Sequence, residues 1–154
     1  MEMVIFCGIQ ATGKTSFYKE KFFKTHMRIS LDQLNTRNKE QVFMAACFAV
    51  QQPFVVDNTN PEKADRVRYI AEAKQHKFKV TGYYFQSRIE DALNRNSHRS
   101  GKDNIPEIGI KGTFGKLELP DPNEGFDALY FVALESNGFV ISDWKQENSV
   151  SFEK

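Results

Sequence analysis

The sequence contains few of the residues that build disulfide frameworks or metal clusters: two cysteines and three histidines among 154 residues. Cys7 lies in an apolar strand pattern and Cys47 in an apolar helical pattern, so we interpret both as small buried hydrophobic residues. No apolar run approaches the ~20 residues that a membrane-spanning helix requires. The acidic, strand-like start is not typical of a signal peptide. These features predict a protein of the reducing cytoplasm with no membrane segment.

Neither sign of charge dominates, because 21 lysine and arginine residues stand against 20 acids and give a formal net charge of +1. The charges are nevertheless segregated along the chain. Residues 95–102 contain Arg95, Arg99 and Lys102 without an acid, whereas residues 117–137 contain five acids without a lysine or arginine. A local basic patch facing phosphate groups fits this distribution better than a broad basic surface for nucleic acid.

No internal repeat, low-complexity segment or linker divides the chain. Its length suits one domain with a substantial core, and its 40% hydrophobic and 27% charged residues are ordinary for a globular protein. Fourteen phenylalanines stand against one tryptophan, and most of them are expected in the core. We therefore predict a single domain over residues 1–154.

One stretch organises the chain: residues 8–15, Gly-Ile-Gln-Ala-Thr-Gly-Lys-Thr, directly after the apolar run at residues 3–7. It matches the phosphate-binding pattern of glycine, four residues and Gly-Lys-Thr at the end of a buried strand. The two glycines permit backbone angles that turn successive N–H groups toward phosphate oxygens. Lys14 adds a positive charge, and the hydroxyl of Thr15 suits Mg²⁺.

The segment after this loop is predicted to be a helix over residues 15–24, whose N-terminus would point its partial positive charge at a bound anion. For residues 8–15 the alternative is a glycine-containing surface turn that matches the pattern by chance, but their position at a strand-to-helix junction argues against it. The residues expected to hold ATP in the loop and first turn are Gly8, Ala11, Thr12, Gly13, Lys14, Thr15 and Ser16.

Strand and helix patterns alternate along the rest of the chain. This alternation predicts an α/β fold of three layers, with a mainly parallel five-stranded sheet and a C-terminal β-hairpin strand. The strands are expected at residues 3–7, 27–31, 53–56, 78–85 and 128–134, with the hairpin strand at 139–144. Further helices are expected at residues 35–51, from Pro61 onward, at 89–95 and at 105–117.

The helical patterns at residues 35–51 and from Pro61 onward each identify a face that should be buried. Asn60 followed by Pro61 is a suitable N-cap and first turn for the second of these helices. The helical pattern at residues 105–117 contains three glycines spaced three apart. Each costs about 1 kcal/mol relative to alanine, so this helix is either loose or very closely packed. The faces expected to be buried are Val42, Phe43, Ala46, Cys47 and Val50, and then Ala64, Val67, Ile70 and Ala71.

Polar side chains follow the second and third strands, at the edge where a parallel sheet presents its functional loops. Asp32 is predicted to be the general base for an acceptor hydroxyl or a ligand of a Mg²⁺-bound water, with capping of the next helix as the structural alternative. Asp57 ends the third strand, where a carboxylate can support Mg²⁺. Thr59 and Asn60 could hold an acceptor phosphate, or only shape the turn and cap the helix.

Arg95 and Arg99 lie four residues apart and would share one face of a helix. Two guanidinium groups on a short mobile element can close over a triphosphate and stabilise charge in the transition state. We therefore predict an arginine lid at about residues 95–117. A solvated basic face is the alternative.

These motifs together resemble those of polynucleotide 5′-hydroxyl kinases and their single-domain bacterial relatives, which have a P-loop NTPase fold. The resemblance runs from residue 4 to about residue 134. It rests on the phosphate loop, Asp32, the stretch Asp57-Asn58-Thr59-Asn60-Pro61, and Arg95-Asn96-Ser97-His98-Arg99 followed by Ile105-Pro106.

The resemblance implies an ATP- and Mg²⁺-dependent kinase. In it, Lys14 and Thr15 hold ATP and the metal, Asp32 is the general base, and Arg95 and Arg99 grip the donor phosphates. It places Asp57, Asn58, Thr59 and Asn60 around the acceptor or the metal, so the expected metal-associated residues are Thr15, Asp32 and Asp57.

The chain departs from this family in three respects. It has Leu31 where many polynucleotide kinases carry an arginine, it has no D-x-D-x-T stretch for a phosphatase, and it has no extended basic groove. The resemblance makes a polynucleotide 5′-OH end the preferred acceptor. The missing arginine and the near-neutral charge favour the alternative, a small-molecule or nucleotide hydroxyl. A third hypothesis, of another class, is an ATP-binding switch or ATPase that transfers phosphate only to water.

Overall fold

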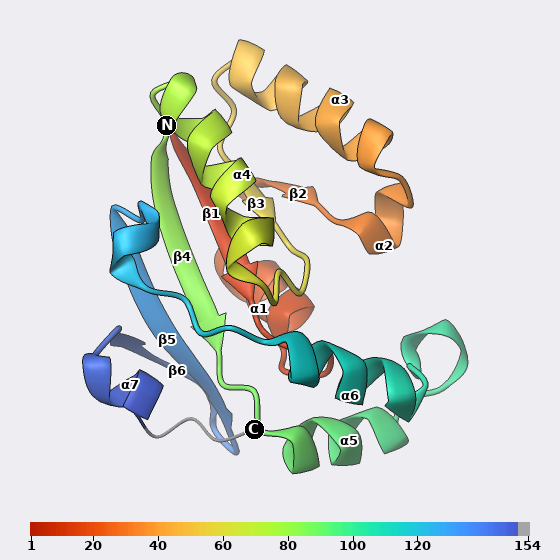
Figure 1. Cartoon of the computed structure of the whole chain (residues 1–154). Helices are drawn as coiled ribbons and strands as arrows, with labels where there is room; N and C mark the ends of the chain where they lie inside the picture. The colour runs from red at the N-terminus through yellow and green to blue at the C-terminus, as the bar shows by residue number, and fades with distance from the viewer. Residues whose placement is uncertain (151–154) are drawn as a thin grey trace.

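Six apolar strands pair into a single sheet in the computed structural model, which describes residues 1–150 (Figure 1). The order across the sheet is β2-β3-β1-β4-β5-β6; the first five strands are parallel, and β6 pairs antiparallel with β5. The predicted parallel core with a hairpin strand at its edge is confirmed. The strands are β1 (Glu2–Cys7), β2 (Met27–Ile29), β3 (Phe54–Val56), β4 (Lys79–Phe85), β5 (Ala128–Glu135) and β6 (Gly138–Asp143).

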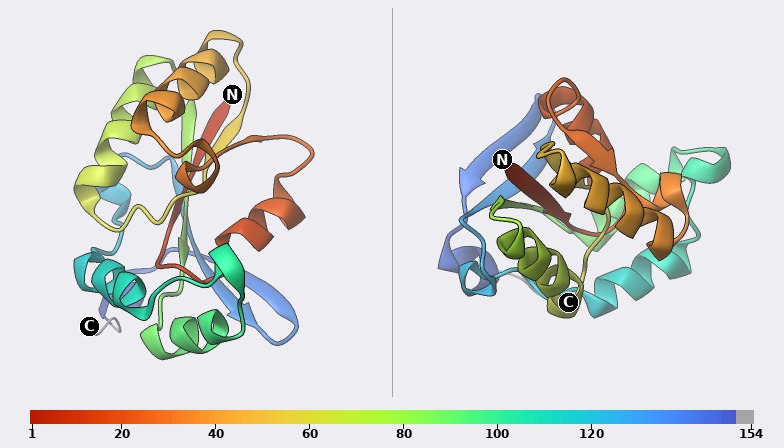
Figure 2. Two further views of the ribbon diagram at one scale, coloured as in Figure 1. Left: turned by 90° about the vertical axis from the view of Figure 1, so that its right-hand side faces the viewer. Right: turned by 90° about the horizontal axis from the view of Figure 1, so that it is seen from above.

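Helices cover both faces of the sheet and close its lower end in Figure 1. Helix α1 lies on one face, and α3 and α4 lie on the other (Figure 2). Helices α5 and α6 lie beyond the carboxyl ends of β1 and β4 (Figure 1). The helices are α1 (Lys14–Lys21), α2 (Leu31–Leu34), α3 (Arg37–Ala49), α4 (Lys63–Gln75), α5 (Ile89–Ser97), α6 (Glu107–Lys116) and α7 (Gln146–Val150), with 3-10 turns at Gly101–Asp103 and Pro122–Glu124.

The central strand β1 is buried on both faces, as its continuous apolar run predicts. Val4 and Phe6 pack toward α1, while Met3 and Ile5 pack toward α3 and α4. Alternate residues of a strand point to opposite faces, so this short segment joins two cores. It also fixes the position of the phosphate loop, which begins where β1 ends. Among residues 1–150, no helix has the length and apolar character needed to cross a membrane.

The predicted buried face of α3 was wrong except at Cys47. Val42, Phe43 and Val50 are 59%, 45% and 74% exposed, and Ala46 is exposed as well. Two apolar stripes compete on this helix, and the short strands β2 and β3 beneath it cover only one. The covered stripe also contains a carboxylate, which an apolar pattern does not reveal. The buried residues of α3 are Glu40, Met44, Cys47 and Phe48.

The predicted start of α4 at Asn60 and Pro61 was also wrong. Asn60 has φ +44° and turns the chain, and the helix begins at Lys63 after a capping box between Glu62 and Asp65. Ala64, Val67 and Ala71 of the expected face are exposed and only Ile70 is buried, because the buried face includes the charged residue Arg66. The buried residues are Arg66, Tyr69, Ile70 and Ala73.

Helix α6 forms over the predicted segment in spite of its three glycines. A Cβ atom added at Gly112 or Gly115 would have no heavy atom within 4 Å outside the helix's own backbone, and one at Gly109 would meet Ile105 at 3.5 Å. The glycines therefore do not serve a close approach to another element.

Candidate active site

The phosphate loop turns from β1 into α1 through backbone angles that favour glycine. Gly13 has φ +93°, and a Cβ atom there would lie 2.8 Å from the ring of Phe139. Gly8 has φ +155°, and a Cβ atom there would lie 3.0 Å from Phe85. Gly13 is the N-cap of α1 and has no side chain to cap the first turn. The N–H groups of that turn, in Lys14, Thr15 and Ser16, have no intrahelical acceptor and are available to an anion.

The Lys14 side chain is buried within this loop. Its ammonium donates to the carbonyl oxygens of Gly8 at 2.9 Å and Ile9 at 2.6 Å, and lies 3.4 Å from the Thr12 hydroxyl. The Thr12 hydroxyl itself donates to the Ile9 carbonyl at 2.8 Å. The loop thus folds around one positive charge, as a phosphate cradle requires.

The charges around Lys14 come from separate parts of the chain. Burial is the main cause that lowers the pKa of Lys14 to about 8; Asp57 and Asp32 oppose this shift, and Arg99 adds to it. Of these charged groups, Asp57 is joined directly to the first turn of the helix after the loop, through the Thr15 hydroxyl at 3.1 Å.

Thr15, Asp57 and Arg28 form a cluster beside the first turn of α1. The Thr15 hydroxyl donates to Asp57 Oδ2 at 3.1 Å, and Arg28 Nε donates to the same oxygen at 2.8 Å. Arg28 Nη2 also lies 3.3 Å from the Thr15 hydroxyl. A hydroxyl beside a buried carboxylate is a hard-oxygen donor set, so Thr15 and Asp57 fit Mg²⁺. Arg28 was not predicted; its charged side chain in an otherwise apolar short strand was the available signal.

Asp32 lies in a helix rather than at the end of a strand. Strand β2 ends at Ile29, Ser30 caps α2 by accepting from the Asp32 N–H at 3.3 Å, and the Asp32 side chain is exposed. The strand expected over residues 27–31 is therefore two residues shorter, because Ser30 starts a helical turn. Capping, the structural alternative for Asp32, is performed by Ser30, which leaves the carboxylate facing solvent.

Asn58, which was predicted to lie near the acceptor, forms hydrogen bonds to two other segments of the protein. Its Oδ1 accepts from the Leu31 N–H at 2.9 Å, and its Nδ2 donates to Glu40 at 3.0 Å. Glu40 is buried and also accepts from the Tyr69 hydroxyl at 2.9 Å. Arg37 donates to both of these partners, at 3.1 and 2.8 Å. Asn58 thus ties the start of α2, and with it Asp32, to the buried carboxylate of α3.

The other two predicted acceptor residues make contacts within the turn. The Thr59 carbonyl accepts from the Gly8 N–H at 2.9 Å, and buried Asn60 donates to the Phe6 carbonyl at 2.9 Å. The Asn60 side chain therefore faces the protein interior. The buried Arg66 guanidinium donates to the Asn60 carbonyl at 3.0 Å and to both oxygens of Glu124 at 2.8 and 3.1 Å.

The predicted lid is joined to the phosphate loop by hydrogen bonds and apolar packing. Arg95 donates to the Ala11 carbonyl at 3.0 Å, and Gln10 donates to Thr113 of α6 at 3.0 Å. Ala92 and Ile110 are buried in one apolar cluster with Ile9 and Ala11, the apolar residues of the loop. The segment predicted to form the lid therefore packs directly on the loop in this structure.

A buried asparagine fixes the connection between the two lid helices. Asn96 donates to the Ile105 carbonyl at 2.6 Å and accepts from the Ile105 N–H at 2.8 Å. Asn104 in turn donates to the carbonyls of Asn96 and Arg99 at 3.0 and 3.2 Å. Arg99 lies beyond the end of α5 and is exposed, so Arg95 and Arg99 do not share one helical face as expected.

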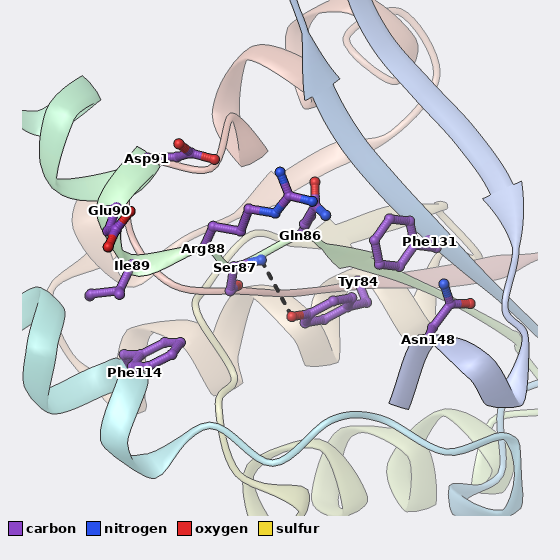
Figure 3. Close-up of a pocket in the computed structure, with 10 residues that line it drawn as sticks. All are labelled: Tyr84, Gln86, Ser87, Arg88, Ile89, Glu90, Asp91, Phe114, Phe131 and Asn148. Atoms are coloured by element: carbon purple, nitrogen blue, oxygen red, sulfur yellow. Dashed lines mark hydrogen bonds between the residues drawn. The ribbon is translucent and has the colours of Figure 1, made fainter. Parts of the chain in front are cut away.

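A pocket of 480 Å³ lies beside this site but is lined by none of the predicted site residues (Figure 3). The hydroxyl of Ser87, one of its lining residues, accepts from the Ile9 N–H at 3.1 Å. Ser87 thus connects the pocket wall to the phosphate loop. The pocket is lined by Tyr84, Gln86, Ser87, Arg88, Ile89, Glu90, Asp91, Phe114, Phe131 and Asn148.

Comparison of the sequence with protein-family models gives no match. A bifunctional polynucleotide phosphatase/kinase of Schizosaccharomyces pombe is 25% identical over 129 residues, which cover 81% of this chain and 32% of that protein. The chain therefore spans about a third of the length of this curated relative.

Solved structures share the fold at lower identity. Kti12 of Chaetomium thermophilum, in complex with ADP-AlF3, superposes with a TM-score of 0.61 at 17% identity, over 88% of this chain and 92% of that one. A gluconokinase from Sinorhizobium meliloti superposes with a TM-score of 0.58 at 16% identity, over 84% and 82%. The chain thus has the fold of the P-loop kinases and is similar in sequence to a polynucleotide phosphatase/kinase.

Proposed function

We propose that the chain is an ATP-dependent kinase that transfers the γ-phosphate to an acceptor hydroxyl. The observation that carries this proposal is the geometry of the phosphate loop: the loop carbonyls hold the Lys14 ammonium, the Thr15 hydroxyl donates to Asp57, and Arg95 donates to the Ala11 carbonyl. Phosphoryl transfer requires positioned phosphates, neutralisation of developing charge and a group that orients or deprotonates the acceptor. Each requirement has a candidate residue within this one site.

The donor half of the site is the phosphate loop with the first turn of α1. The loop N–H groups and the Lys14 ammonium would bind the β- and γ-phosphates, with Arg95 and Arg99 on the outer side. The complex of Kti12 with ADP-AlF3 supports nucleotide binding by this fold. Thr15 and Asp57 would hold Mg²⁺, which when bound supplies charge neutralisation to the phosphates.

The acceptor half is proposed to be centred on Asp32. This exposed carboxylate lies in the first turn of α2, which Asn58 anchors to Glu40. Because the Ser30 hydroxyl caps this helix, the Asp32 carboxylate is not used for capping. An exposed carboxylate in this position can accept the proton of a hydroxyl during attack on the phosphate. The similarity to a polynucleotide phosphatase/kinase supports a polynucleotide 5′-OH end as the acceptor.

A second candidate acceptor is the hydroxyl of a nucleotide or another small molecule. The net charge of +1 favours this alternative, because nucleic-acid affinity usually depends on an extended basic surface. Leu31, the apolar residue before Asp32, also provides no cationic contact for a polynucleotide phosphate, unlike the arginine that many polynucleotide kinases carry at this position.

The proposal is tested by incubation of the protein with γ-labelled ATP and a panel of 5′-OH DNA, 5′-OH RNA and nucleosides. Label on the DNA or RNA ends would support the polynucleotide acceptor, and label only on nucleosides would support the small-molecule alternative. Release of labelled phosphate without labelled acceptor would support an ATPase or nucleotide-dependent switch and overturn the kinase proposal.

A further inference from the structure

Arg28 places a positive charge at the position proposed for the metal. Its guanidinium contacts Asp57 Oδ2 through Nε at 2.8 Å and the Thr15 hydroxyl through Nη2 at 3.3 Å. The Asp57 side chain is 3% exposed and that of Arg28 is 22% exposed. A buried carboxylate requires a positive partner or hydrogen bonds, and in this protein Arg28 is the cationic partner.

The same two oxygen groups are the ones a divalent cation would use. Hard cations take carboxylate and hydroxyl oxygens, and Thr15 and Asp57 present these within 3.1 Å of one another. A guanidinium and a divalent cation cannot both approach one carboxylate oxygen without repulsion. The internal ion pair and the metal are therefore competitors for this pair of residues.

From these contacts we propose that Arg28 is a built-in cation that keeps free divalent metal out of the site, so that metal enters only together with a nucleotide polyphosphate. The inference rests on the proposed binding of a nucleotide by the phosphate loop.

The charge balance supports this coupling. In the free protein three cations, Lys14, Arg28 and Arg99, act on this region against two carboxylates, those of Asp57 and Asp32. The positive charge is therefore in excess, and a further divalent cation is repelled. A bound polyphosphate brings several negative charges and offers the Arg28 guanidinium an alternative partner. The metal can then take the oxygen atoms that Arg28 leaves.

The test is direct measurement of metal binding with Mn²⁺ as a spectroscopic probe, in the free protein and in the ADP complex. Wild-type protein should bind Mn²⁺ weakly when free and much more tightly with ADP. Arg28→Gln, which keeps a polar side chain without the charge, should bind Mn²⁺ at least tenfold more tightly when free. Arg28→Lys should behave like the wild type, because it retains the charge.

A matched control is Arg37→Gln, which removes a guanidinium from another buried carboxylate, Glu40, on α3. It should leave Mn²⁺ affinity unchanged. Circular dichroism confirms that each variant is folded, and Mn²⁺ should raise the melting temperature of free Arg28→Gln but not of the wild type.

Equal affinity of free wild type and Arg28→Gln for Mn²⁺, including absence of binding by both, would overturn the inference. Because these measurements contain no acceptor and no turnover, they remain informative if phosphate transfer is not observed. Failure of the kinase proposal is read separately, from the labelled-ATP panel.

Discussion

The Arg95 guanidinium donates to the backbone carbonyl of Ala11 at 3.0 Å, which joins α5 directly to the phosphate loop. Ala11 has φ +62°, a conformation that non-glycine residues rarely adopt. A charged hydrogen bond at this carbonyl helps hold the loop in its observed form. The segment proposed as a lid is thus joined to the loop proposed to bind phosphate.

Arg95→Ala is therefore expected to weaken ATP binding about tenfold, since hydrogen bonds to charged groups contribute about 1.5–3 kcal/mol and part of this is regained from water. The dissociation constant is measured by calorimetry. Arg88→Ala is the control, because Arg88 precedes the same helix but lines the separate pocket. Equal affinities for the two variants would show that the Arg95 contact does not support the loop.

The affinity for ATP should fall as the pH rises above about 8. Burial lowers the pKa of Lys14 to about 8, so the free protein progressively loses the ammonium charge above that pH. Below it the lysine is protonated and affinity is constant. Above it each pH unit costs up to about tenfold in affinity, because polyphosphate binds the protonated form.

Titration of ATP into the protein across this pH range checks the sign of the effect. Near pH 8, binding should take up a proton, which appears as a heat that depends on the buffer. Lys14→Met should bind ATP more weakly at every pH and show no step near 8. An affinity that rises with pH would contradict the assignment of Lys14 as the phosphate ligand.

Asn58→Ala should impair phosphate transfer while leaving ATP affinity near the wild-type value. The change removes the link from the Leu31 N–H to Glu40 and leaves a buried carboxylate with one fewer donor. The expected loss in the free energy of unfolding is about 1–3 kcal/mol. Chemical denaturation measures the stability, and steady-state kinetics measures the transfer.

Gln41→Ala is a suitable control, because it also removes a side-chain hydrogen bond of α3, the exposed one to Glu72. Its stability should change by less than about 0.5 kcal/mol. A loss of ATP affinity in Asn58→Ala equal to its loss of transfer would refute a role limited to the acceptor side.

Gly112→Ala should stabilise the protein by about 1 kcal/mol, because the position is helical and open on its outer side. Gly82→Ala should destabilise it, since a Cβ atom in the buried strand β4 would lie 2.6 Å from Phe126. Melting temperatures of the two variants test this difference in sign. A fall in turnover of the more stable Gly112→Ala variant would indicate that α6 must deform during the reaction.

The sequence was sufficient to predict the parallel sheet, the hairpin strand and the phosphate loop. These depend on local patterns: the apolar run of β1, the glycine spacing of the loop and the two strand patterns at residues 128–134 and 139–144. The burial of Cys7 and Cys47 is confirmed for the same reason.

The buried polar contacts were not predictable from these patterns. Arg66 with Glu124, and Glu40 with Tyr69, join residues that are 58 and 29 positions apart. Each pair is stable in the interior only because the fold brings its partner to it. Periodicity counts charged residues as surface, and so it selected the wrong faces of α3 and α4.

Asp32 illustrates what each kind of information contributes. Its position after the second strand indicated the functional edge of the sheet. Only the structure shows that Ser30 performs the capping and that Asn58 anchors the helix, which leaves the Asp32 carboxylate exposed. The chemical role of this carboxylate is therefore the central claim to be tested.

The most direct test compares wild type with Asp32→Asn, in parallel assays of ATP binding and of label transfer from γ-labelled ATP to a 5′-OH oligonucleotide. The substitution keeps the size of the side chain and removes its ability to accept a proton. We predict that Asp32→Asn binds ATP with affinity close to that of the wild type and transfers label at least about a hundredfold more slowly, as expected for loss of a general base. Undiminished transfer by Asp32→Asn would contradict the account.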